Sequence, residues 1–173
     1  MAETPETRAK GILKSLVSRL ARHHNVHVDW ETAPTSAYGA TTGQSDITLT
    51  LRDKLTMRNC VWYIEVKAKS NTASAKQVQY LQRKFRMGCE AWVLWADDTQ
   101  DLLAFAERFV CVARALALDL PSVGYIRLKK YGEASPSCDG VTLFCEPKTL
   151  QVAREFNKEL LPLTPYAPPV KGE

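Results

Sequence analysis

The sequence predicts an α/β protein in which a mixed central sheet is flanked by helices. Three observations carry this prediction. Apolar residues recur at helical spacing in some segments, alternate with polar residues in others, and run unbroken over residues 91–95. A fully apolar strand is typical of the buried centre of a sheet. The 173 residues suffice for one domain with a substantial core and are too few for two.

The first half of the chain predicts one helix followed by three strands. Residues 6–24 place apolar side chains at helical spacing, and residues 26–30 alternate as a short strand does. Residues 32–45 are small and polar and include glycines, which favours a loop. Residues 46–52 then alternate cleanly, and residues 61–67 form the next strand after a polar turn.

The second half predicts a helix, a strand and another helix. Ser74 begins a helix that extends to about Met87 and is followed by glycine, a common helix stop. Residues 91–95 form the buried strand, and residues 99–118 form a helix that ends before Pro121.

The end of the chain predicts a small appendage. Residues 124–129 and 141–145 favour a hairpin around a turn rich in Gly, Ser and Pro, and residues 148–161 favour a last helix. The tail beyond is proline-rich and expected to be extended. The expected organisation is a core over 1–120, an appendage of the same domain over 121–161, and a tail over 162–173.

Composition excludes several classes of protein. Apolar residues make up 45% and charged residues 24%, which is ordinary for a globular domain and excludes a disordered chain or a coiled coil. No apolar run approaches the ~18 residues of a membrane helix, and no signal peptide is recognisable. Five cysteines without a C-x-x-C pair favour reduced thiols in a cytoplasm, or in a nucleus if the source is eukaryotic.

Positive charge is concentrated in the middle of the chain. Residues 52–90 hold nine Lys or Arg against three acids, a surplus of six, whereas the whole chain carries only +4. A basic segment on a nearly neutral body indicates a surface that faces a polyanion. A solvated helix face with loop charges explains the same count equally well.

Glu65 is the most informative residue, because it lies within the otherwise apolar strand 61–67. Burying a carboxylate costs on the order of several kcal/mol unless a cation or hydrogen bonds meet it. Strand alternation puts Lys67 on the same face as Glu65, and Asp46 begins the neighbouring strand. We therefore expect these three side chains to meet at one edge of the sheet.

Two convergent carboxylates predict a site for Mg²⁺ or Mn²⁺, which favour oxygen ligands. The carbonyl of Val66 is a further candidate ligand. A metal held there polarises a phosphodiester and activates water, while Lys67 orients that water or neutralises charge on the phosphate. The alternative is that Glu65 and Lys67 form only an ion pair at a strand end, since isolated E-x-K tripeptides are common.

The ordered set Gly43-Gln-Ser-Asp46, Ile64-Glu-Val-Lys67 and Ser74-x-x-Gln77 resembles the PD-(D/E)XK nuclease superfamily. Within it, the chain is most similar to the virus-type replication-repair nuclease (VRR-NUC) group, over roughly residues 6–110. The resemblance implies a restriction-endonuclease-like core of order αβββαβ. It also implies that Asp46 and Glu65 are metal ligands, that Lys67 is catalytic and that Gln77 assists in the active site.

Two assignments keep alternatives. Gln77 completes a capping box with Ser74, which explains it as well as catalysis does. Glu6 is a candidate for the acid that many relatives carry on the first helix. Accessible side chains around the Gln77 helix are expected to contact phosphates or bases, with a solvated face as the alternative; they are Lys69, Lys76, Tyr80 and Lys84.

The expected function is a nuclease that hydrolyses DNA with Mg²⁺ or Mn²⁺, with RNA left open as a substrate. The resemblance implies structure-selective cutting of branched DNA, such as Holliday junctions, by a homodimer in replication, repair or recombination. Two other classes remain. One is a non-catalytic nucleic-acid-binding module with the same fold. The other is a protein-interaction adaptor that uses the C-terminal hairpin and tail.

Overall fold

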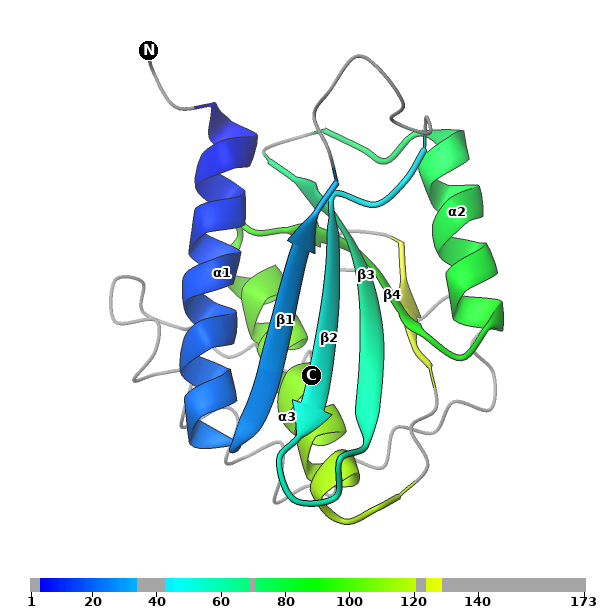
Figure 1. Cartoon of the computed structure of the whole chain (residues 1–173). Helices are drawn as coiled ribbons and strands as arrows, with labels where there is room; N and C mark the ends of the chain where they lie inside the picture. The colour runs from blue at the N-terminus through cyan, green and yellow to red at the C-terminus, as the bar shows by residue number, and fades with distance from the viewer. Residues whose placement is uncertain (1–3, 34–42, 69–70, 121–123, 129–173) are drawn as a thin grey trace, which may run out of the picture.

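The computed structural model describes residues 4–33, 43–68, 71–120 and 124–128. These residues form a five-stranded mixed sheet with helices on both faces (Figure 1). The spatial order of the strands follows the chain. They are β1 (Val26–Thr32), β2 (Ile47–Asp53), β3 (Asn59–Lys67), β4 (Glu90–Trp95) and β5 (Ile126–Arg127). Strand β2 pairs antiparallel with both β1 and β3, whereas β4 runs parallel to β3 and β5 parallel to β4.

Helices α1 (Pro5–His23) and α3 (Thr99–Ala117) cover one face of the sheet. Thr4 caps the start of α1 and Asp98 caps that of α3, so free backbone N–H groups of each first turn find an acceptor. Between these helices and the sheet lies the main core. Its largest fully buried side chains are aromatic and stack or meet edge to face: Trp62, Trp92, Phe105 and Phe109.

Helix α2 (Ala75–Arg86) covers the other face and is the crossover between the parallel strands β3 and β4. Ser74 and Gln77 form the capping box that begins the helix. Leu81 is the one side chain of α2 that is fully buried. It packs in a smaller cluster with Val93, Trp95 and other residues of β4 and β5. The α2 face therefore has a thinner core than the α1–α3 face.

The order of elements expected from the sequence is observed from α1 to α3, and it gives the mixed sheet flanked by helices. The start of the expected appendage, however, contributes to the main sheet: Ile126 pairs with Ala91 in parallel. A Cβ atom at Gly124 would lie 2.6 Å from the carbonyl oxygen of Cys89, so only glycine allows this close approach. The expected strand 141–145, the helix 148–161 and the tail 162–173 lie outside the described residues.

Two buried ion pairs join β4 and β5 to α3. Arg108 donates hydrogen bonds to both carboxylate oxygens of Glu90, and Arg127 donates to Asp101. Asp101 also accepts the backbone N–H of Trp95. Burial raises the pKa of both carboxyl groups, and the guanidinium partners oppose that rise. Each acid is thus paired, as a buried charge requires.

Two expectations drawn from composition concern the state of the cysteines and membrane-spanning helices. Cys60 and Cys89 are free thiols, but Cys111 is disulfide-bonded. The expectation that all the thiols are reduced was therefore wrong, because an odd number of cysteines excludes only complete pairing. Among the described helices, none combines the length and the apolar character that crossing a bilayer demands.

Candidate active site

The acidic residues singled out in the sequence meet at one end of the sheet. In the antiparallel register Ile47 lies opposite Ile64, so one step further along Asp46 lies opposite Glu65. Directly opposed side chains on one face have Cβ atoms about 5 Å apart. The backbone N–H of Val66 donates to Oδ2 of Asp46 over 2.9 Å, and this bond holds the carboxylate against β3.

Glu65 is almost completely buried, with 2% of its surface exposed. Its Oε1 atom accepts hydrogen bonds from Nζ of Lys67 at 2.6 Å and from Nε2 of Gln77 at 2.5 Å. Its Oε2 atom is buried and has no hydrogen-bond partner among the described residues. A buried oxygen without a partner is uncommon in native proteins and often marks a functional position.

The same surroundings change the acidity of Glu65. Burial raises the pKa of its carboxyl group from the ordinary value of 4.5 to about 7, and Lys67 opposes the rise. The negative charge of Asp46 raises it further. A cation that binds between the two carboxylates relieves their mutual repulsion. It also replaces the hydration that the buried oxygen has lost. The electrostatics of this pair therefore favour a cation ligand.

Gln77 contacts both the start of α2 and the buried carboxylate of Glu65. Its Oε1 atom accepts the backbone N–H of Ser74 at 2.8 Å, which completes the capping box. Its Nε2 atom, at the other end of the same amide, donates to Glu65. One side chain thus fixes the first turn of α2 and connects that helix to the buried carboxylate of β3.

Lys10 belongs to this site and was missed by sequence reasoning. Its Nζ atom lies 2.7 Å from Oδ1 of Asp46 and comes from α1, 36 residues away. The one available signal is its position beside the buried residues Ala9 and Leu13, which brings it to the rim of the helix face that packs on the sheet. Glu6, the expected first-helix acid, accepts a long bond of 3.4 Å from Asn71.

The expected nucleic-acid contacts are divided by the structure. Lys69 lies outside the described residues, and Lys76 is exposed in the first turn of α2. Tyr80 and Lys84 are only partly exposed, because both turn toward Tyr63 of β3. The ring of Tyr80 meets that of Tyr63 edge to face at 5.9 Å, and Nζ of Lys84 lies 4.4 Å from the centre of the Tyr63 ring.

The donor set at this end of the sheet consists of oxygen atoms. Within the described parts of the chain, no group of three or more His, Cys, Asp and Glu side chains is arranged to hold a metal. The candidate ligands are the carboxylates of Asp46 and Glu65 and the carbonyl of Val66. In a strand, the N–H and C=O of one residue face the same neighbour, so this carbonyl faces the Asp46 side. Such a set fits Mg²⁺ or Mn²⁺.

Comparison of the chain with models of protein families finds no match, and comparisons with curated proteins and with solved structures find no significant match either. Arguments about function therefore depend on the chemistry of these side chains.

Proposed function

We propose that the protein is a divalent-metal-dependent nuclease that hydrolyses phosphodiester bonds in DNA. One observation carries the proposal: two opposed carboxylates lie together with a lysine and an amide at one sheet end, and one of them has a buried oxygen that no described residue hydrogen-bonds. An ion pair between Glu65 and Lys67 alone would not explain why that oxygen is buried without a hydrogen bond from a described residue. The resemblance of the same residues to the PD-(D/E)XK pattern supports the same activity.

Asp46, Glu65 and the Val66 carbonyl would hold Mg²⁺ or Mn²⁺. When bound, such an ion supplies Lewis-acid polarisation of the phosphodiester and a more acidic water. Lys67 brings an ammonium group to the same place, where it neutralises charge that develops on the phosphate or orients the attacking water. Gln77 restrains the orientation of Glu65 through its amide N–H.

Lys10 has a distinct part in this proposal. Its ammonium pairs with Asp46 in the metal-free protein, and it would have to leave Oδ1 for that oxygen to bind a divalent ion. Its side chain is about one third exposed, so the released ammonium can contact a phosphate at the mouth of the site.

The decisive experiment is a cleavage panel with Mg²⁺, Mn²⁺ or EDTA on linear duplex, single-stranded, flap and four-way-junction DNA, and on RNA. We expect cleavage of DNA that EDTA and Asp46→Asn both abolish. Asp29→Asn, which neutralises an exposed acid of β1, is the matched control and should remain active. Cleavage that persists in EDTA, or in Asp46→Asn, would contradict the proposal.

The finer specificity is also proposed: branched DNA as substrate and a homodimer as the active species. One site cuts one strand, and resolving a junction requires two coordinated cuts, which a two-fold dimer supplies most simply. Light scattering of the intact protein tests this. A monomer that still resolves junctions would contradict the dimer.

A second candidate function is a nucleic-acid-binding module without catalysis. The observation in its favour is that each carboxylate already has an ammonium partner, Lys10 for Asp46 and Lys67 for Glu65. It predicts DNA binding that is indifferent to EDTA and no cleavage of any substrate in the panel.

A further inference from the structure

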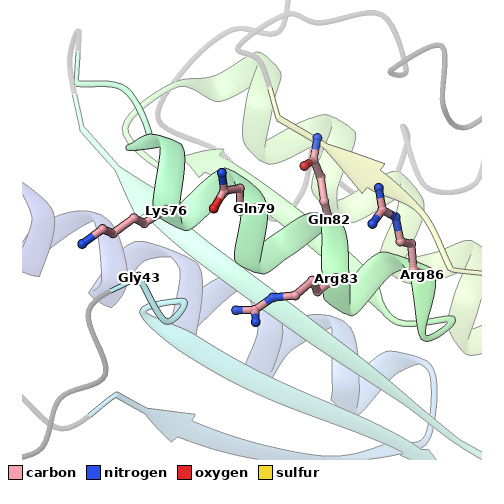
Figure 2. A pocket seen from close by; sticks show the side chains of 6 residues that line it. All are labelled: Gly43, Lys76, Gln79, Gln82, Arg83 and Arg86. Carbon is pink, nitrogen blue, oxygen red and sulfur yellow. The ribbon is translucent and has the colours of Figure 1, made fainter.

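The outward face of α2 lines a pocket of about 370 Å³ (Figure 2). We call its helical residues the α2 stripe. The stripe consists of Lys76, Gln79, Gln82, Arg83 and Arg86. Three of these side chains are cations and two are amides, and α2 contains no acidic residue. Figure 2 shows the stripe extending along the helix from Lys76 to Arg86.

The spacing of the stripe gives it a direction and a length. Residues 76, 79, 83 and 86 recur at intervals of three and four, which places them on one side of a helix. Ten residues of helix extend about 15 Å. A DNA strand carries one phosphate per ~3.4 Å of duplex axis, so the length of the stripe equals the axial rise of roughly four phosphates.

The stripe starts at the candidate active site. Gly43, three residues before Asp46, adopts a φ of 99°, and a Cβ atom there would lie 3.0 Å from Cβ of Lys76. The strand-leading loop is therefore pressed against the first turn of α2, and only glycine allows this approach. Lys76 is in turn next to Gln77, whose amide reaches Glu65. A polyanion bound along the stripe would therefore extend toward the two carboxylates.

The chemistry of the stripe selects the ligand. Guanidinium, ammonium and amide groups are the usual donors to phosphate oxygens. Proteins that bind single strands add aromatic platforms on which bases stack, and none of the described residues that line this pocket is aromatic. Tyr80 of α2 packs edge to face against Tyr63, and the guanidinium group of Arg83 lies over the Tyr80 ring. These features favour the phosphate backbone of a duplex over unpaired bases.

We infer that the α2 stripe binds the phosphate backbone of a duplex DNA arm that flanks the cleaved bond, without reading its sequence. The inference rests on the proposed function, because it takes DNA as the substrate and the carboxylates as the place of cleavage. The three like charges on one helix face repel one another, and bound phosphates relieve this repulsion. The charge of the free protein at this surface therefore favours binding of a polyanion.

The test measures binding without cleavage. Fluorescence anisotropy of a labelled duplex of about 20 base pairs is followed in EDTA between about 50 and 200 mM NaCl. Arg83→Gln/Arg86→Gln is compared with Lys14→Gln/Lys54→Gln, which removes the same charge from exposed positions on α1 and the β2–β3 turn. We expect the stripe variant to lose roughly tenfold in affinity and about two units of the log–log salt slope, with little change in the control.

Two further variants make the outcome specific. Arg83→Lys/Arg86→Lys keeps the charge and should restore most of the salt slope, which a merely misfolded helix would not do. Equal affinities and slopes for the stripe and control variants overturn the inference. So does a loss confined to single-stranded DNA, or to RNA duplexes. Loss of cleavage in Asp46→Asn with an unaffected stripe variant leaves the proposed function intact and removes only this inference.

Discussion

The ammonium group of Lys10 lies 2.7 Å from Oδ1 of Asp46 and so joins the first helix to the residue immediately before β2. The pair is partly exposed, with about one third of the lysine side chain and one quarter of the aspartate side chain accessible. A cation at this carboxylate competes with any divalent ion that uses the same oxygen. The first helix therefore bears directly on the electrostatics of the candidate site.

We expect Lys10→Met to strengthen metal binding, because it removes that competitor. The midpoint for Mn²⁺ should decrease by up to about fivefold, the equivalent of the ~1 kcal/mol that a partly exposed ion pair contributes at most. Isothermal titration in the absence of DNA measures it. Lys14→Met, on the exposed side of the same helix, is the control. A weaker Mn²⁺ affinity in Lys10→Met would show that the ammonium does not compete.

The metal-free protein should become less stable as the pH rises. The pKa of Glu65 is about 7 in the folded protein against 4.5 ordinarily, so between these values the folded chain holds a proton that the unfolded chain has released. The free energy of unfolding then falls with rising pH, by up to about 3 kcal/mol above pH 7. Glu65→Gln removes this dependence and should be the more stable protein at pH 8 in EDTA.

Urea unfolding at pH 5 and pH 8 measures the difference between wild type and Glu65→Gln. The control is Glu31→Gln, at an exposed position of β1. An unchanged pH dependence in Glu65→Gln would mean that Glu65 titrates normally.

Substitutions of Gln77 and Ser74 separate capping from support of Glu65. Ser74→Ala removes one side of the capping box but leaves the Gln77–Glu65 bond, and it should cost about 1 kcal/mol of stability. Gln77→Ala loses both contacts. We expect similar melting temperatures for the two variants but a much lower cleavage rate for Gln77→Ala. Gln77→Glu keeps an acceptor for Ser74 and sets a second carboxylate beside Glu65, so it should also lose activity. Equal rates for all three variants would leave capping as the only role of Gln77.

The fit of β5 depends on Gly124. An added methyl group would meet backbone atoms of Gly88 and Cys89 within 2.6–2.7 Å, so β5 would have to move away from β4. We expect Gly124→Ala to destabilise the protein by about 1–3 kcal/mol, the usual cost of overpacking, as measured by urea unfolding. Gly11→Ala is the matched control, because its Cβ atom meets open space within α1, and alanine favours a helix there. If Gly124→Ala were as stable as the wild type, β5 would be able to move away from β4 at little cost in free energy.

What the sequence predicted well depends on local patterns. Alternation identified β2 and β3, the S-x-x-Q pair identified the start of α2, and the two-residue period placed Glu65 and Lys67 on one face. The opposition of Asp46 and Glu65 followed from the adjacency of antiparallel strands.

What the sequence did not predict depends on packing between distant segments. The Lys10–Asp46, Glu90–Arg108 and Asp101–Arg127 pairs join residues 18 to 36 positions apart, and no local period relates them. Tyr80 and Lys84, which the sequence placed at accessible positions, are only partly exposed, for a different reason. Both lie on the same helical side as Gln77, and that side faces β3. The outward side begins one residue earlier, at Lys76.

Helix α2 has one fully buried side chain, whereas α3 has twelve buried residues. The free energy needed to open α2 locally is therefore much smaller than that needed to open α3, since few apolar contacts are lost. Such an opening detaches the Gln77 amide from Glu65 while the sheet stays folded. The support of Glu65 thus depends on a short helix that few apolar contacts hold against the sheet.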